Sequence, residues 1–327
     1  MNKSGYETPR CPGSLKEAFT TYNPGSLRWL FSGRKVFHVL EGSPWGNMWE
    51  QSQIHGNHFG GQSWYRMVLN RNKPEPHPLG NYILKTVNEV NPTLKFPNEQ
   101  AGNEHFCLQL ARQVFDIDVI PNAMIFFENG QPAFIGKYDD HFPVKGDLLK
   151  GGFGTLAAQP ESLIEIPANY TIFDLAGIIN ELVAAASVAR ERFFQYVLFS
   201  WLIANGHAYV NRFRLYKTER GDYMLAPLSD ILCTRVHELS PEIAAPGGLY
   251  SGDRDSAQFR EYGHYTRNEF TEFARRCGIR KNRYEKILDD MVASRYEAGK
   301  LIEKAFMPEE ATNIIRYYFN ERVLRLK

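Results

Sequence analysis

Two segments in the second half of the chain carry residue types that suit phosphoryl transfer. Residues 205–215 are Asn-Gly-His-Ala-Tyr-Val-Asn-Arg-Phe-Arg-Leu, and residues 225–232 are Leu-Ala-Pro-Leu-Ser-Asp-Ile-Leu. The first segment is typical of a catalytic loop that leads into a short hairpin, and Asp230 in the second is typical of a metal-binding carboxylate. Such a loop needs a carboxylate base and a metal-binding amide, yet His207 and Arg212 stand at those two positions. The sequence therefore predicts the framework of a phosphotransferase with part of its chemistry altered.

The first half of the chain supplies residues that suit nucleotide phosphates. Gly60 and Gly61 precede a predicted strand, where a glycine turn lets backbone amides approach a phosphate. Lys85 lies on the next predicted strand, and Glu104 opens the following predicted helix, so the carboxylate can hold the lysine. Each residue alone also fits a plain structural role, as a turn, a surface lysine or a helix-dipole charge. Their order and spacing favour the functional interpretation.

Strand patterns dominate the first 140 residues. The predicted strands are bounded by Gly or Pro and rich in β-branched and aromatic residues, and they span residues 35–40, 60–69, 81–87, 123–128 and 131–137. Asn129-Gly130 predicts a tight type I′ hairpin turn between the last two. Helices are predicted at residues 26–31 and 103–115, and the rest of residues 1–60 is irregular.

Helical patterns dominate after about residue 140. They span residues 172–187, 190–204, 267–277, 283–294, 297–306 and 309–323. Thr266 and Glu269 form a predicted capping box before one of them. A strand-rich region followed by a helical region predicts an α+β, bilobal architecture, with a ligand cleft between the lobes.

Composition excludes some classes of function. The formal net charge of the 327-residue chain is +1, so no global field attracts nucleic acid. A basic group at residues 275–283 has the pattern of a solvated helix end. No run of about 18 apolar residues predicts a membrane span, and we expect a cytoplasmic protein. The four cysteines form no CxxC pair, so we expect core thiols and no zinc knuckle.

Four segments, taken together, have a recognisable pattern. Residues 103–111 are Asn-Glu-His-Phe-Cys-Leu-Gln-Leu-Ala and residues 134–139 are Phe-Ile-Gly-Lys-Tyr-Asp, followed by residues 199–215 and 225–232. This pattern resembles the HipA family, serine/threonine kinases of bacterial toxin–antitoxin systems. The resemblance covers about residues 60–327 and looks closest to compact members without the full N-terminal subdomain.

The resemblance implies a protein-kinase-like bilobal fold. Residues 1–59 would form an irregular segment packed on the N-lobe, residues 60–139 a β-rich nucleotide-binding N-lobe, and residues 140–327 a helical C-lobe with the catalytic loop. It implies retained roles for Lys85 on phosphates and for Asp230 on the metal. The other residues that it places at the nucleotide are Gly60, Gly61, Gln62, Glu104, Lys137, Tyr138 and Asp139.

Two loops depart from the family pattern. An ungapped alignment puts His207 on the base Asp and Arg212 on the metal-binding Asn. A gapped alternative leaves Asn205 at the Asp position and Asn211 near the Asn, and both alignments lack the catalytic carboxylate. In the phosphate loop, Ser-Gly-Val-Gln-x-Lys of the family is replaced by Phe-Gly-Gly-Gln-Ser-Trp at residues 59–64.

These departures predict weakened metal chemistry. Mg²⁺ prefers oxygen ligands in an octahedron, whereas Arg212 would add a positive charge beside it. Two such charges about 4 Å apart repel by about 4 kcal/mol at an effective dielectric near 20. We therefore expect a pseudokinase that acts by binding a protein or a nucleotide, with ATP as a candidate ligand and weak or no Mg²⁺ binding.

Other interpretations stay open. The chain could be an active ATP-dependent serine/threonine-protein kinase toxin that phosphorylates a translation-related protein. It could instead transfer an adenylyl group, with Arg212 and Lys85 holding the phosphates. His207 could also be a packed loop residue without a ligand. The family resemblance implies an antitoxin-like helix-turn-helix partner, while direct contact with nucleic acid or a membrane is not expected.

Overall fold

A computed structural model of the chain describes residues 7–42, 46–55, 59–87, 90–137, 169–208, 213–217 and 222–327. Its strand-rich part is one seven-stranded sheet in the order β1-β6-β7-β5-β3-β2, with β4 also paired to β3. All pairs are antiparallel except β1–β6. The strands are β1 Val39–Leu40, β2 Gln53–Ile54, β3 Ser63–Asn70, β4 Lys73–Pro76, β5 Tyr82–Thr86, β6 Asn122–Phe127 and β7 Pro132–Lys137.

One face of the sheet is covered by a short N-terminal helix, α1 (Pro24–Phe31). Asn23 caps this helix by accepting a hydrogen bond from the Ser26 amide, and Pro24 fits its first turn because its φ is already helical. Leu30 and Phe31 of α1 belong to one buried cluster with side chains of β3, β5, β6 and β7. The irregular N-terminal segment therefore supplies half of the sheet's packing.

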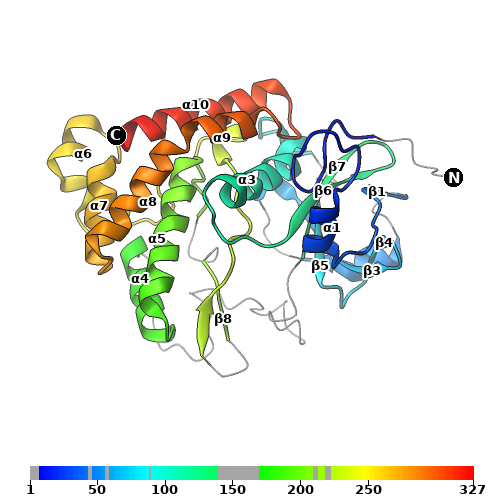
Figure 1. Cartoon of the computed structure of the whole chain (residues 1–327), viewed down its shortest axis with the longest axis horizontal. Coiled ribbons are helices and arrows are strands. Elements are labelled where there is room, and N and C mark those ends of the chain that lie inside the picture. Colours follow the sequence, from blue (N-terminus) through cyan, green and yellow to red (C-terminus); the bar gives the residue numbers. More distant parts are fainter. Residues whose placement is uncertain are drawn as a thin grey trace.

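The other face is covered by α3 (Gln100–Val114), which also contacts the helical part of the chain. Figure 1 shows α3 between the sheet and the helices α9 (Arg295–Ile302) and α10 (Glu309–Arg325). Gly102 makes this close approach possible, because a Cβ at this position would overlap the carbonyl oxygen of Phe306. The α3 helix is thus buried between the two parts of the structure.

The helical part begins at residue 169, after residues 138–168, which lie outside the described ranges. It contains a short antiparallel hairpin, β8 (Leu215–Lys217) and β9 (Tyr223–Leu225), near the predicted catalytic loop. Its remaining helices are α4 Ile172–Leu182, α5 Ala186–Leu202, α6 Ala257–Tyr262, α7 Arg267–Arg276 and α8 Lys281–Ala293. The aromatic side chains of α5 fill the centre of the main core, which continues onto α3 and the sheet.

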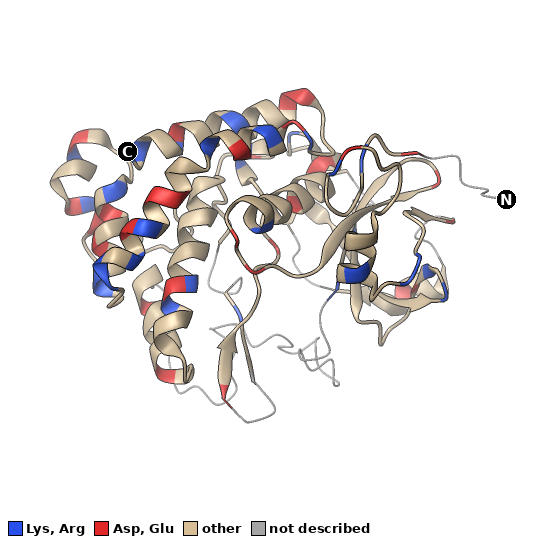
Figure 2. Cartoon of the chain, in the orientation of Figure 1, with Lys and Arg blue, Asp and Glu red and all other residues tan. Residues whose placement is uncertain are grey.

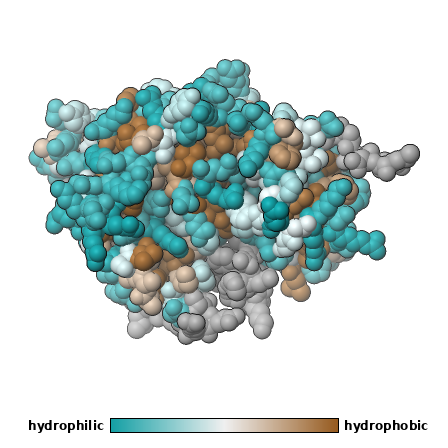
Figure 3. All heavy atoms as spheres, viewed as in Figure 1, coloured by the Kyte–Doolittle hydropathy of each residue, from teal (hydrophilic) through white to brown (hydrophobic). Residues whose placement is uncertain are grey.

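Charged residues are mixed on the helical surface. Figure 2 shows basic and acidic positions interspersed along α7, α8 and α10, and Figure 3 shows hydrophilic residues over most of that side of the view. Arg275 and Arg276 both pair with Glu272, and Arg283 pairs with Glu191, which confirms the predicted solvated helix end. All four cysteines are buried and reduced. No helix in the described ranges has the length and apolar character needed to cross a membrane.

The sequence predicted most elements but not their limits. The Thr266–Glu269 capping box is confirmed. The type I′ turn is wrong, because Gly130 has a φ of +83° while Asn129 does not adopt a positive φ; the Asn129 side chain accepts from the Gln131 amide instead. The strand expected at residues 35–40 is only two residues long.

Two α-helices and two strands also went unpredicted, namely α2 (Asn47–Ser52), α6, β2 and β4. The β4 strand was missed because it contains Pro74 and Pro76, which lack a donor and are tolerated only at a sheet edge. Helix α3 begins at Gln100, three residues earlier than expected, so Glu104 lies in its second turn and does not open it.

Candidate functional site: a buried cluster of two cations and two carboxylates

The central feature of the site is a charge cluster around Lys85. Its ammonium lies 2.5 Å from the Glu104 carboxylate on α3 and also contacts the Asp230 carboxylate. Arg214 contacts the other oxygen of Asp230. The side chains of Lys85, Glu104 and Asp230 are at most 2% exposed. Buried charges are costly unless they are paired, so the balance of two positive and two negative groups is what permits this burial.

The sheet register places aromatic rings on both sides of the lysine. Trp64 of β3 and Phe134 of β7 are the direct cross-strand neighbours of Lys85 on β5. The Lys85 ammonium lies 4.0 Å from the Trp64 ring centroid and 5.1 Å from that of Phe134. Both rings present a negative face to the cation, which stabilises it. Trp64, which the sequence comparison placed at the basic position of the phosphate loop, thus packs its ring on the lysine.

Asp230 reaches the cluster through an unusual backbone conformation. Its φ is +54°, in the left-handed region that residues with a side chain rarely adopt. The preceding segment is fixed by hydrogen bonds from the Ile120 amide to the Leu228 carbonyl and from the Leu228 amide to the Asp118 carbonyl. Local strain of this kind persists only where surrounding structure maintains it. The conformation directs the carboxylate toward Lys85 and Arg214.

Asn103 connects α3 to the segment that follows Asp230. Its amide nitrogen donates to the Cys233 carbonyl at 2.9 Å, and its oxygen accepts from the Cys233 amide at 2.9 Å. The same nitrogen lies 3.0 Å from His237 Nε2, and His237 Nδ1 lies 3.0 Å from the Lys95 carbonyl. Burial lowers the pKa of His237 to about 4. His237 is therefore neutral near pH 7, donating from Nδ1 and accepting at Nε2.

The predicted catalytic loop is anchored by Thr234. Its hydroxyl accepts from the Gly206 amide at 2.9 Å and donates to the Ala204 carbonyl at 2.9 Å. Ala204 has a φ of +58°, so the chain reverses direction sharply before the loop begins. Because Thr234 lies only four residues after Asp230, the loop and the Asp230 segment are held as one unit.

His207 lies at the surface edge of this unit. Its Nε2 is 2.7 Å from the Glu238 carboxylate, and its amide donates to the Asn205 side chain at 3.1 Å. The ring of Phe59 meets the His207 ring edge-on with centroids 5.0 Å apart, and it also lies 5.7 Å from the His237 ring. Phe59 therefore packs the glycine turn onto the catalytic-loop position.

The glycine turn itself is closely packed. Gly60 and Gly61 have φ values of +64° and +75°. A Cβ on Gly60 would overlap the side chains of Gln100 and Leu94. The Gln62 side chain is buried, and its oxygen accepts from the Trp64 indole at 3.3 Å. The structure therefore brings these three predicted residues to the edge of the cluster, with the Gln62 oxygen facing Trp64.

Some predicted positions cannot be compared. Arg212, Tyr138 and Asp139 lie outside the described residues, as do Tyr209 and Asn211. Lys137 ends β7, where its Cα pairs with that of Tyr82 on the lysine-bearing strand. The predictions for these residues stay predictions.

Two functional side chains were missed. Arg214 lies within the quoted segment 205–215, two residues after Arg212, but its residue type alone gave no signal. Glu238 lies far from His207 in sequence, and only the fold brings the two together. The sequence did mark Asn103, because the Asn-Glu-His start of the helix was part of the recognised pattern. It could not show which groups the Asn103 side chain contacts.

Asp230 is the residue that the sequence analysis assigned to a metal. Its two carboxylate oxygens each contact a cation, one Lys85 and the other Arg214. Mg²⁺ is bound by hard oxygen ligands, with one or two carboxylates completed by water and phosphate oxygens. A divalent ion at Asp230 would therefore have to displace one of these two cations.

Comparison with known proteins identifies the family. Residues 64–298, more than half of the chain, match the model of the HipA-like C-terminal domain. The chain belongs to this family. The recognised pattern and the α+β kinase-like fold are thereby confirmed for this HipA-like protein. A comparison with curated protein sequences found no match.

Two solved structures are similar to this chain. The HipA toxin of Shewanella oneidensis MR-1, determined with HipB and operator DNA, is 13% identical over 87% of this chain, with a TM-score of 0.56. This chain spans 66% of that protein's length. The proinflammatory kinase CtkA of Helicobacter pylori is 13% identical over 82% of this chain and 89% of its own, with a TM-score of 0.47.

Proposed function

We propose that this HipA-like protein is a binding module of impaired transfer activity that holds the phosphates of a nucleotide without a divalent cation. The observation that carries the proposal is the contact of both Lys85 and Arg214 with Asp230. In this arrangement a guanidinium supplies the positive charge that a metal ion supplies in an active kinase. A guanidinium binds phosphate through two parallel hydrogen bonds, so Arg214 suits this ligand.

The energetics favour exchange at Arg214 over exchange at Lys85. The Arg214 side chain is 11% exposed, whereas the Lys85 side chain is fully buried and also contacts Glu104. An incoming triphosphate can therefore share the Arg214 guanidinium with Asp230 and leave the buried lysine in place. A magnesium ion is positive like Lys85 and Arg214, so it competes with these side chains for Asp230 and does not assist the ligand.

The test is the thermal stability of the full chain with ATP, measured with EDTA and with excess Mg²⁺. We expect equal stabilisation in both, and its loss in Arg214→Met. Arg260→Met is the matched control, because Arg260 of α6 makes an exposed ion pair with Asp255. This variant should leave the stabilisation by ATP unchanged. Stabilisation that requires Mg²⁺ in the wild-type protein would contradict the proposal.

A second candidate function is residual transfer with His207 as the base. The observation that favours it is the 2.7 Å contact between His207 Nε2 and the Glu238 carboxylate. A carboxylate beside an imidazole orients the ring, and here Glu238 brings a negative charge from another segment to a loop that lacks one.

Labelled ATP distinguishes these functions. Under the binding proposal, neither γ-labelled nor α-labelled ATP modifies the protein or added protein acceptors. Transfer of the γ-label that Glu238→Gln abolishes would establish the kinase alternative. Transfer of the α-label would establish adenylyl transfer.

The likeness to a toxin solved with its antitoxin supports one further part of the proposal. Shewanella HipA is found with HipB and operator DNA, and we propose a small helix-turn-helix antitoxin as partner of this chain. Co-expression with a helix-turn-helix protein encoded next to it, followed by size-exclusion chromatography, tests this partnership. Separate elution of the two proteins would argue against it.

A further inference from the structure

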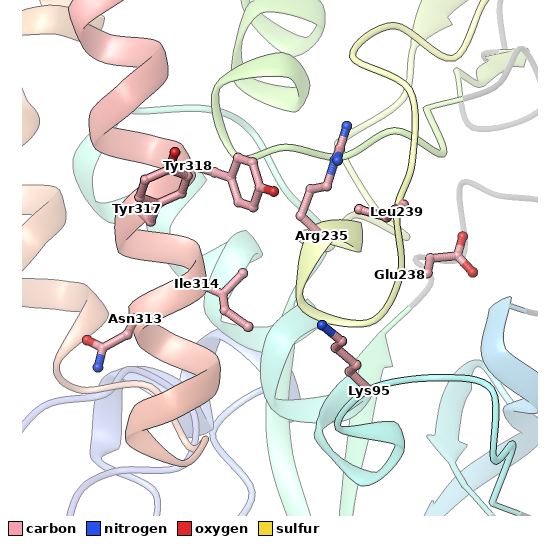
Figure 4. A pocket seen from close by; sticks show the side chains of 8 residues that line it. All are labelled: Lys95, Arg235, Glu238, Leu239, Asn313, Ile314, Tyr317 and Tyr318. Atoms are coloured by element: carbon pink, nitrogen blue, oxygen red, sulfur yellow. The ribbon is translucent and has the colours of Figure 1, made fainter.

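A surface pocket lies beside the His207 loop, and its lining residues come from three segments. Its volume is about 420 Å³, within the range of small-ligand and side-chain pockets. Figure 4 shows Ile314 and Tyr318 extending from α10 toward the loop that carries Arg235 and Leu239, with Tyr317 farther from that loop. The remaining lining residues are Lys95, Glu238 and Asn313.

Two cations of this pocket have no carboxylate at ion-pair distance within the described ranges. Lys95 is an exposed residue of the loop before α3, and Arg235 lies in the short helix η4 (Thr234–Val236). The Arg235 guanidinium lies 5.5 Å from the centroid of the Tyr318 ring, and its Nε is buried without a hydrogen-bond partner. The pocket's single lining carboxylate, on Glu238, points away from Lys95 in Figure 4 and contacts His207. The pocket therefore presents uncompensated positive charge.

The same pocket exposes apolar side chains. Leu239 is 87% exposed and Tyr317 is 65% exposed, so two large side chains of the pocket lining are open to a ligand. Positive charge combined with exposed Leu and Tyr suits a ligand that carries both acidic and apolar groups. A free nucleotide or a phosphate ion would leave the apolar side unused, whereas a peptide segment offers both kinds of side chain.

The pocket is rigidly connected to the site. The Lys95 amide donates to the His237 carbonyl at 2.9 Å, and the Lys95 carbonyl lies 3.0 Å from His237 Nδ1. His237 in turn contacts Asn103, and the adjacent Glu238 contacts His207. A segment bound here would lie beside Glu238, whose carboxylate contacts His207 of the predicted catalytic loop.

We propose that this pocket docks an acidic, apolar peptide segment of the protein partner, with carboxylates on Lys95 and Arg235 and an apolar side chain against Leu239 and Tyr317. The inference rests on the protein partnership proposed above. It gives that partnership a ligand class, namely a chain segment with acidic residues next to Leu, Ile or Phe.

The experiment selects binders from random 12-residue peptides displayed on phage, with the immobilised full chain as target. Enriched peptides are then labelled with fluorescein and titrated by anisotropy. We expect two or more acidic residues beside an apolar residue in these peptides. Lys95→Glu with Arg235→Glu should weaken binding about tenfold or more, because each like charge opposes the ligand.

Three further variants make the result specific. Arg34→Glu with Lys35→Glu changes the net charge equally at exposed positions after α1 and should leave peptide affinity unchanged. Lys95→Glu alone, at an exposed position, covers the case in which the double variant does not fold, and should weaken binding about threefold or more. Leu239→Ser should lower affinity without changing its salt dependence.

Four outcomes would overturn the inference. They are enriched peptides without acidic residues, equal affinity for wild-type protein and the Lys95/Arg235 variant, displacement by inorganic phosphate alone, and absence of enrichment over empty phage. The ATP stability shift is measured on the same variants. Its persistence when peptide binding is lost separates failure of this inference from failure of the nucleotide proposal.

Discussion

The contact between Lys85 and Glu104 allows a quantitative test of the charge cluster. The two charged atoms lie 2.5 Å apart, and both side chains are at most 1% exposed. Coulomb attraction at this distance is about 7 kcal/mol at an effective dielectric near 20, and desolvation offsets much of it. Removing one partner of a buried pair typically costs about 3–5 kcal/mol. We expect a loss in this range for Lys85→Met.

The double variant with Glu104→Gln should recover part of that loss. Lys85→Met leaves two carboxylates facing one cation, whereas the double variant restores one cation, Arg214, to one carboxylate, Asp230. Contacting residues show coupling energies of about 0.5–3 kcal/mol, and complete burial places this pair at the upper end. The free energy of unfolding should therefore fall less in the double variant than the two single losses added together.

Urea denaturation of the four proteins, followed by circular dichroism, measures this coupling. The matched control is the exposed pair Lys286 and Asp290 on α8, at 67% and 60% exposure. Its cycle, with Lys286→Met and Asp290→Asn, should give a coupling below about 0.5 kcal/mol. Additive losses at Lys85 and Glu104, within the same limit as the control, would refute the reasoning.

Three other perturbations have defined outcomes. Gly102→Ala should destabilise the protein by about 1–3 kcal/mol, because the added methyl group overlaps Phe306. Gly177→Ala, where α4 leaves open space, should stabilise it by up to about 1 kcal/mol. Thermal melts compare the two variants with the wild-type protein. Asn103→Leu strands two buried backbone groups, at about 1–3 kcal/mol each, and wild-type stability in urea would contradict this. The folded-state pKa of His237, about 4, lies below its ordinary 6.5. The neutral His237 ring therefore contributes about 3 kcal/mol to the free energy of unfolding above pH 6.5, and this contribution is lost as the pH falls toward 4. In His237→Gln, the free energy of unfolding measured in urea should change less with pH over that window.

The sequence predicted the cluster better than its surroundings. Glu104 was expected to hold Lys85, and Asp230 was expected at the same site as a metal ligand, because their residue types and order matched a known chemistry. The contact between Lys85 and Asp230, 145 positions apart, was not expected. Arg214 and Glu238 were not expected, because their roles arise from packing between distant segments. No local pattern marks a side chain that completes a charge balance across the fold.

Element types were likewise easier to predict than element details. The β-branched run at β5 and the apolar stripe of α3 determined strand and helix. The Asn129-Gly130 turn was mistaken because hairpin geometry depends on the loop's own hydrogen bonds, here the Asn129 side chain to the Gln131 amide. The two prolines of β4 argue against a strand when propensity alone is considered. They are tolerated because β4 lies at the edge of the sheet, and that position follows from the whole sheet and not from the local sequence.

The left-handed conformation of Asp230 and its distant partners has a consequence for the time course of folding. We expect the carboxylate to meet Lys85 only after the sheet and the hairpin segment have each formed, since the two residues are 145 positions apart in the sequence. Contacts of such long sequence separation close late. Loss of the cluster should thus shorten the lifetime of the native state and leave the rate of reaching it nearly unchanged. The buried charge cluster would then determine the rate at which the folded protein unfolds.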